Sequence, residues 1–418
     1  MAFQLNPREI CEKDIIKLTK KYSKKLKKET SIKVLSELFM ELIYLFFDNP
    51  KRKLYKLFFP VIMVNLIENG SINSIINEYK NTKKLYSESY TCRILKQLNQ
   101  DTGLEISRVF RKILFRILKR NGFKSRGFCV AVDITAKPFY GNKKLCMVKG
   151  TKRKAGTNFA MQYLTASIVE EGARFNLLCF SVSQLTLVDR KVEQMISEIE
   201  RTISIKLFYL DRGFASRNYC RIIKSLGYKV IMPITKNNKL KELKLSIKEQ
   251  SEISDEEYTL SELDYIFYED RPKEYQEDMK LLALYEKKRN KKDPEVFFFI
   301  TNIYNLESKN YYLLIESYRY RFGIETNYRV DNIFSGFTTS TIPSRRYLLM
   351  QMSLIVQDLW TLVNFLTCDK KHQQPREKFK INYSVLAVIK SRTRQLNFIW
   401  RPTITAVQFK RQMERVFG

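Results

Sequence analysis

Histidine is almost absent from this sequence: among 418 residues, only His372 occurs. Metal sites built on paired histidines need two or more of them, and a Ser-His-Asp triad needs one that is buried and oriented. His372 stands in the polar, loop-like segment CDKKHQQP, which fits neither requirement. If the chain is an enzyme, the sequence therefore predicts that carboxylates carry its chemistry.

Paired cysteines and long apolar runs are lacking as well. The seven cysteines are spread singly and form no CxxC motif, so neither a zinc ribbon nor a disulfide framework is indicated. The segment closest to an apolar run of membrane length, 347–366, contains Gln351, Gln357, Asp358 and Asn364. We interpret it as a buried helix. The first residues are charged and lack an apolar signal core, so we expect a cytoplasmic protein.

Acidic residues are too few to balance the basic ones. There are 75 Lys and Arg against 44 Asp and Glu, which gives a formal charge of +31. An imbalance of this size in a soluble protein indicates a polyanionic partner, chiefly nucleic acid, with an anionic membrane surface as the alternative. The one strongly acidic stretch, between Glu242 and Asp278, holds 13 acidic residues.

Three regions differ in their patterns. Helical spacing of apolar residues extends through 1–125, where the segment 70–98 fits either a loose helix-turn-helix or an ordinary helical bundle with a basic exterior. Strand-like runs then predict a mixed α/β sheet over 126–340, interrupted by an inserted subdomain at about 236–310. A helical region with a basic tail follows at 341–418.

The central region is predicted to contain three strands joined by hairpins, then a helix, a strand, a helix and a strand. The expected hairpin turns are Gly141-Asn142 and the stretch Glu170-Glu171-Gly172. The other expected elements are a strand at 128–135, a helix at 190–203, a strand at 205–210, a helix at 218–227, strands at 228–234 and 296–303, and a helix over most of 311–334.

Two aspartates stand at the ends of apolar strands in this pattern. Asp133 follows FCVAV and Asp211 follows IKLFYL. Ligands gather at such strand ends in α/β sheets, and two carboxylates held on neighbouring strands would repel each other unless a cation lies between them. Mg²⁺ or Mn²⁺ prefers such oxygen ligands. Each aspartate alone could equally cap a turn. Gly213 is expected to let the chain leave the second strand sharply.

A third carboxylate lies in the segment ESYRYRFGIETNYRVDN. If this segment is one helix, Tyr318, Arg321, Glu325 and Asn332 fall within an arc of about 60°, and Arg329 lies on the same face. A solvated polar face explains any one of these residues. It explains less well why Glu325 is the only acid there, among groups that bind phosphate.

The pattern Tyr-x2-Arg-x3-Glu-x6-(Lys/Asn) resembles the signature of insertion-sequence transposases of the DDE, RNase H-like superfamily. LDRGF around Asp211 is similar to their second-aspartate motif, and VAVDIT around Asp133 suits the first. The spacing fits members whose RNase H-like core carries an insertion before the glutamate. One departure is Asn332, because the family usually has lysine there, and asparagine brings no charge to a phosphate contact.

The resemblance implies phosphoryl transfer on double-stranded DNA, at transposon terminal inverted repeats and at target DNA. Asp133, Asp211 and Glu325 would be the catalytic residues and would hold two Mg²⁺ ions, for which Mn²⁺ can substitute. Arg321 and Tyr318 would contact DNA near the cut end, together with Arg329 and Asn332. The resemblance further implies a homodimer on paired ends, association with the nucleoid, and recognition of the DNA ends by 1–125.

A basic segment, KKLCMVKGTKRK at 143–154, holds six basic residues and no acid. Its residues Lys149, Lys152, Arg153 and Lys154 either follow the DNA backbone or serve as a solubilising charge run. Two alternatives to a transposase stay open: a catalytically silent or domesticated DNA-binding relative, and an RNase H-like nuclease without strand transfer.

Overall fold

The computed structural model describes residues 100–120, 127–170, 173–234, 238–252, 258–286, 295–322 and 338–367, with a few single positions between residues 65 and 336. Within the N-terminal region predicted to be helical, helix α6 (Gln100–Arg120) is found as expected. The segment proposed as a loose helix-turn-helix, His372, and the chain after residue 367 lie outside the described residues, apart from single positions in the first.

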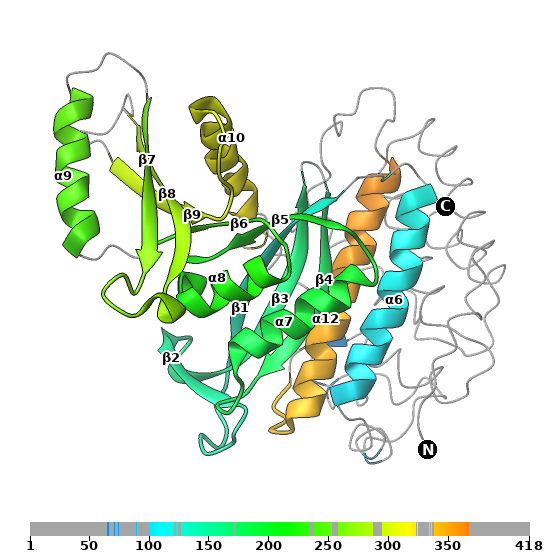
Figure 1. Ribbon diagram of the computed structural model, residues 1–418. Coiled ribbons are helices and arrows are strands. Elements are labelled where there is room, and N and C mark those ends of the chain that lie inside the picture. The colour runs from blue at the N-terminus through cyan, green and yellow to red at the C-terminus, as the bar shows by residue number, and fades with distance from the viewer. Residues whose placement is uncertain are drawn as a thin grey trace.

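The described part of the chain forms one open, mixed sheet of nine strands (Figure 1). The strands are β1 Phe128–Pro138, β2 Val148–Lys154, β3 Thr157–Glu170, β4 Ala173–Val182, β5 Ile205–Leu210, β6 Val230–Pro233, β7 Tyr258–Phe267, β8 Glu277–Glu286 and β9 Glu295–Thr301. Their order is β2-β3-β1-β5-β6-β9-β8-β7, with β4 also paired to β3. The predicted mixed α/β sheet is therefore confirmed.

The first part of the sheet is antiparallel, because β3 pairs with β1 on one side and with β4 and β2 on the other. The hairpin predicted after Glu170 is confirmed, since Glu170 pairs with Ala173. The hairpin predicted at Gly141-Asn142 is wrong, because β2 pairs with β3 and not with β1. The β2–β3 hairpin closes instead at Ala155 and Gly156, whose φ angles are 50° and 82°, as a two-residue turn of type I′ requires.

Six helices and three short 3₁₀ turns accompany the strands in the described ranges. Besides α6, they are α7 Val188–Glu200, η2 Arg212–Phe214, α8 Arg217–Ser225, α9 Asn238–Glu252, η3 Lys273–Tyr275, α10 Ser308–Tyr318, η4 Arg319–Arg321 and α12 Pro343–Thr367. Helix α7 leads from β4 to β5 and α8 leads from β5 to β6, and β1, β5 and β6 run parallel. The predicted order of helix, strand, helix and strand is thus found.

Helices cover both faces of the parallel strands. Side chains alternate between the faces of a strand, and Val132 and Leu210 pack in the cluster that contains residues of α7 and α8. Ala131 and Tyr209 pack in a second cluster with Tyr311, Ile315 and Tyr318 around α10. Helices α7 and α8 therefore cover one face of the sheet, and α10 covers the other (Figure 1).

The segment 236–310, expected as an inserted subdomain, continues the main sheet. Strand β9 pairs antiparallel with β6, β8 with β9, and β7 with β8. Strand β8 is buried on both faces, since Leu281 packs in the first cluster and Leu282 in the second. Acidic side chains such as Asp264 and Glu269 lie at the exposed surface. The acidic composition thus marks the outer surface of a sheet extension and not a separate layer.

Helices α6 and α12 lie side by side next to β4 (Figure 1). The predicted buried helix over 347–366 is confirmed as part of α12, whose polar residues are buried but hydrogen-bonded. Gln351 donates to the carbonyl of Cys179, and Asp358 accepts from the backbone and side-chain nitrogens of Asn176 at 2.8 and 3.0 Å. Of the helices in the described ranges, none is long and apolar enough to cross a membrane.

Candidate active site

Asp133 and Asp211 occupy matching positions on neighbouring parallel strands. The ladder between β1 and β5 ends at the pair Val132 and Leu210, so Asp133 is the next residue of β1 and Asp211 is the first residue after β5. Neighbouring strands lie about 4.8 Å apart. Asp133 does not end its strand as expected, because β1 continues along β3 to Pro138 after β5 has stopped. The two aspartates meet at the end of the parallel pairing.

The chain turns immediately after Asp211. Four buried residues, 207–210, fix the end of β5 in the sheet, and the turn η2 follows, with the Phe214 amide donating to the Asp211 carbonyl at 2.9 Å. Phe214 is buried and anchors this turn in the core. Gly213 does not have the role expected for it: its φ is not positive, and nothing lies within 4 Å of the position that a Cβ would take. An alanine would fit there.

Tyr318, at the end of α10, holds the end of β5 from the opposite side. Its hydroxyl donates to the Leu210 carbonyl at 2.9 Å, and its ring makes edge contacts with Tyr209 and Phe299. The side chain is buried. In this arrangement the hydroxyl is engaged by the protein, so Tyr318 positions the residue before Asp211, and the predicted DNA contact of Tyr318 has no exposed group to make it.

Arg321 carries the charge beside Asp211. Its Nη2 lies 3.7 Å from the Asp211 Oδ1, and the two side chains are 8% and 44% exposed. The guanidinium also lies over the rings of Tyr318 and Phe322, 5.5 and 5.2 Å from their centroids. A distance of 3.7 Å is an ion pair without a short hydrogen bond. Asp211 makes no side-chain hydrogen bond to the η2 backbone, so its oxygens remain accessible to a further ligand.

The helix expected over 311–334 is interrupted. Regular α-helix ends at Tyr318, a 3₁₀ turn covers Arg319–Arg321, and helical geometry returns at Phe322 and Ile324. The single α-helical face expected for Tyr318 and the residues after it does not continue through this turn. Tyr318 and Arg321 nevertheless both reach the end of β5. Glu325, Arg329 and Asn332 lie outside the described residues.

The charged side chains of the site affect the pKa of the Tyr318 hydroxyl. Burial raises the pKa of the Tyr318 hydroxyl, Arg321 lowers that pKa, and the negative charges of Asp211 and Asp133 raise it again. Both carboxylates therefore disfavour ionisation of the same hydroxyl. Asp133 accepts a hydrogen bond on Oδ1 from the Ile134 amide at 2.8 Å.

The two aspartates fit a hard divalent cation. Both carboxylates are partly exposed, stand on adjacent rigid strands, and offer the oxygen ligands that Mg²⁺ prefers. Within the described ranges, no group of three or more His, Cys, Asp and Glu side chains forms a metal site. Glu325, the third carboxylate that the resemblance implies, lies outside the described residues, so this absence does not extend to it.

The basic segment predicted at 143–154 forms a loop and the outer strand β2. Lys152 and Arg153 are exposed and Lys149 is half-buried, which lowers the pKa of Lys149. The side chain of Lys154 lies outside the described part. Lys149 pairs with Ala160, which also pairs with Pro138 of β1. Pro138 follows Asp133 by about 16 Å along the strand, so this basic edge lies well away from the carboxylates.

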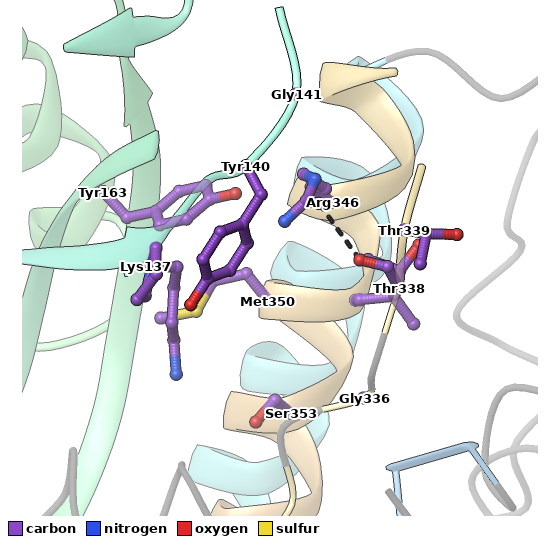
Figure 2. A pocket seen from close by; sticks show the side chains of 12 residues that line it. Lys137, Tyr140, Gly141, Tyr163, Gly336, Thr338, Thr339, Arg346, Met350 and Ser353 are labelled. Carbon is purple, nitrogen blue, oxygen red and sulfur yellow. Dashed lines mark hydrogen bonds between the residues drawn. The ribbon is translucent and has the colours of Figure 1, made fainter. Parts of the chain in front are cut away.

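A pocket that the sequence did not indicate lies between the end of β1 and α12 (Figure 2). Its volume is about 480 Å³. Figure 2 shows Tyr140 and Lys137 on the β1 side and Met350 and Arg346 on α12. Arg346 donates to the carbonyls of Ser340 and Thr338 at 2.6 and 3.0 Å, and Tyr140 is 68% exposed. The lining of this pocket includes neither Asp133 nor Asp211, so the pocket is not part of the candidate active site.

Comparison with known proteins yields no match: the chain matches no protein-family model and no curated protein. The functional assignment therefore depends on this chain's own residues and on the sequence resemblance at Asp133, Asp211 and Glu325.

Proposed function

We propose that the chain is a DNA transposase of the DDE, RNase H-like type, which uses Mg²⁺ to cleave transposon ends and to join 3′-hydroxyl ends to target DNA. The observation that carries the proposal is the register of β1 and β5, which sets Asp133 and Asp211 side by side next to Arg321. Two carboxylates on neighbouring strand ends can hold the Mg²⁺ ions that assist phosphoryl transfer.

The strand order supports the RNase H-like part of the proposal. Strands β4, β3 and β1 are antiparallel, β1, β5 and β6 are parallel, and helices connect the parallel strands. This is the chain order that the resemblance implies. Strands β7 to β9 stand between β6 and α10, where the resemblance implies an insertion before the glutamate.

The exposure and contacts of the four site residues and the resemblance at Glu325 together suggest a role for each. Asp133 and Asp211, with Glu325 as the third ligand that the resemblance implies, would hold the Mg²⁺ ions. When bound, these ions lower the pKa of the attacking water or 3′-hydroxyl and stabilise the leaving oxygen. Arg321 is buried and keeps the Asp211 carboxylate oriented toward the site, while Tyr318 fixes the strand end through the Leu210 carbonyl.

The partner proposed is double-stranded DNA. The formal charge of +31 favours a polyanion. Lys152 and Arg153 stand exposed on an outer strand, where they can contact phosphates without disturbing the core. A homodimer on paired ends, and an association with the nucleoid, belong to the proposal through the resemblance alone.

The test is a cleavage and joining assay on duplexes taken from the DNA that flanks the coding sequence of this chain, because the resemblance implies that the enzyme acts on the ends of its own element. We expect Mg²⁺-dependent strand cleavage by the unchanged protein. Asp133→Asn, Asp211→Asn and Glu325→Gln should each abolish cleavage and leave DNA binding largely intact. Asp264→Asn, an exposed aspartate on β7, is the matched control and should cleave normally.

The same assay separates the alternatives. DNA binding without cleavage by the unchanged protein, under Mg²⁺ and under Mn²⁺, would mean a catalytically silent DNA-binding relative. Cleavage without joining of the 3′ ends would mean a nuclease. Normal cleavage by Asp211→Asn would refute the assignment of the site itself.

A further inference from the structure

A second pocket, also of about 480 Å³, lies between α6 and the end of α7. We name it the α6–α7 pocket and define it by its charged lining: Arg108, Arg111, Lys112, Arg116, Lys119 and Arg201 are basic, and Glu198 is acidic. Helix α7 covers the sheet face opposite to α10. The pocket is therefore separate from the candidate active site, which lies on the α10 side.

Among the lining residues that the structure describes, the one acid, Glu198, is already engaged. Arg108 donates to both oxygens of Glu198, at 3.0 and 2.6 Å, and Arg201 donates to the same carboxylate at 3.0 Å. A carboxylate shared by two guanidiniums cannot neutralise the other cations of the pocket. Six basic groups against one acid leave a strong excess of positive charge in a concave site, which attracts anions.

Arg111 is the unusual member of this set. It is only 3% exposed, and its Nε donates to the Ser107 carbonyl at 3.2 Å. Its Nη1 is buried and has no hydrogen-bond partner among the residues that the structure describes. The pKa of Arg111 is lowered to about 10, chiefly by burial and also by Arg108, while Glu198 and Asp358 oppose the shift. The group is therefore still charged at neutral pH, and a buried guanidinium nitrogen without a hydrogen bond is costly.

The exposed cations form a row along α6. Arg108, Lys112, Arg116 and Lys119 follow one another at intervals of four, four and three residues, which keeps them on one helix face over about 16 Å. One phosphate group cannot reach all of them. A single DNA strand carries about five phosphates over such a length. The row thus matches an extended polyanion better than a small phosphate ion.

We propose that the α6–α7 pocket binds the phosphate backbone of DNA at a site separate from the candidate active site. The row on α6 contacts successive phosphates, and the pocket, with Arg111 at its floor and Glu198 orienting Arg108 and Arg201, receives one of them. The proposal shares its partner, DNA, with the proposed function but requires no cleavage. It also accounts for a buried cation that a merely solubilising surface would not contain.

The first test uses the unchanged full-length protein and a mixed-sequence duplex at low salt. Lysines are acetylated for a limited time, with and without saturating DNA, and the labelling of each is read by mass spectrometry. Bound phosphates should slow the acetylation of Lys112 and Lys119 by about fivefold or more. Lys273, which is exposed on η3 within the acidic stretch, is the matched control and should label at the same rate.

The second test compares two double variants with equal loss of charge. Lys112→Gln combined with Lys119→Gln should reduce the slope of log binding constant against log salt by about two, since each phosphate contact contributes about 0.9. Lys273→Gln combined with Lys309→Gln, at exposed positions in the sheet extension and on α10, should leave the slope unchanged. Both pairs are on the surface, so both variants should fold.

Unchanged acetylation of Lys112 and Lys119 while DNA is bound, or equal slopes for the two double variants, would overturn the proposal. Protection of these lysines by millimolar inorganic phosphate but not by DNA would overturn the choice of DNA and assign the pocket to a small phosphate ligand. These outcomes are independent of the proposed function: loss of protection with normal Mg²⁺-dependent cleavage refutes only the pocket, and protection without cleavage refutes only the transposase.

Discussion

Replacing Asp211 by asparagine should remove the response of the protein to Mg²⁺ while leaving the fold in place. The change keeps the size of the side chain and removes one negative charge, 3.7 Å from the Arg321 guanidinium. At that distance an ion pair amounts to about 1 kcal/mol in water and about 4 kcal/mol at an effective dielectric constant of 20. Because the Asp211 side chain is 44% exposed, solvent screening brings the value to about 1 kcal/mol.

The loss of this ion pair is offset by relief of the repulsion between Asp211 and Asp133, which stand on adjacent strands. We therefore expect the free energy of unfolding of Asp211→Asn to lie within about 1 kcal/mol of the unchanged protein when no metal is present. A cation bound only by the folded chain at ten times its Kd adds about 1.4 kcal/mol. For a chain of 418 residues that raises the Tm by about 1.5–2 °C.

The assay is thermal unfolding in a Mg²⁺ titration, read by fluorescence or calorimetry. The unchanged protein should show a saturating rise in Tm, and Asp211→Asn and Asp133→Asn should show none. Asp264→Asn is the control, because Asp264 is exposed and pairs with Lys280 away from the site, and it should respond like the unchanged protein. If Asp211→Asn keeps the full Mg²⁺ response, the two strand-end aspartates do not form the metal site.

Three further predictions follow from buried and strained positions. In urea unfolding, Arg321→Lys should lower the free energy of unfolding by about 1–2 kcal/mol, because the buried guanidinium loses its contacts with Asp211 and two rings. The control is Arg319→Lys, since Arg319 is exposed beside Glu286 and Glu316. It should change the free energy of unfolding by less than about 0.5 kcal/mol. Ala155→Gly should stabilise the β2–β3 hairpin by about 0.5–1 kcal/mol, since Ala155 has a φ of 50°. Gly156→Ala should destabilise the hairpin, and a gain in stability from Gly156→Ala would contradict the type I′ turn. Burial raises the pKa of Asp358 well above its usual range, so the folded state holds a proton that the unfolded chain releases. The free energy of unfolding should therefore fall as the pH rises from about 4 toward that raised pKa. In urea unfolding across pH, Asp358→Asn should flatten this dependence and be at least as stable as the unchanged protein at pH 7.

The elements predicted correctly from the sequence are those whose local residue pattern determines their secondary structure. Strand β5 is an apolar run that ends in Asp-Arg-Gly, and α12 combines apolar periodicity with too many polar residues for a membrane span. Both are found where expected. The same local pattern placed Asp133 and Asp211 at strand ends, but their adjacency depends on the parallel pairing of β1 with β5, which three strands and α7 separate along the chain.

The sequence-based predictions are wrong where contacts between residues distant in the sequence determine the local structure. Gly141 was interpreted as a turn residue, but a Cβ there would lie 2.7 Å from the Phe139 Cζ, so the glycine is needed for close packing. The actual turn uses Ala155, which rarely adopts a positive φ, and therefore gave no turn signal. Strand β7 was missed because acidic residues obscure the alternation of this edge strand, and β8 was missed because it is buried on both faces and therefore shows no alternation.

The high positive charge of the chain does not by itself say which cations contact DNA, but burial separates them. Arg321 and Arg111 are almost fully buried, and each acts on a site inside the fold: one orients a carboxylate, the other forms the floor of a pocket. Lys112, Lys119 and Lys152 are exposed, so under the proposed function they would contact DNA phosphates and release counterions. The salt dependence of binding should therefore come from the exposed lysines, while the two buried arginines determine geometry. Removing a buried arginine and removing an exposed lysine are thus different perturbations, although the net charge changes equally.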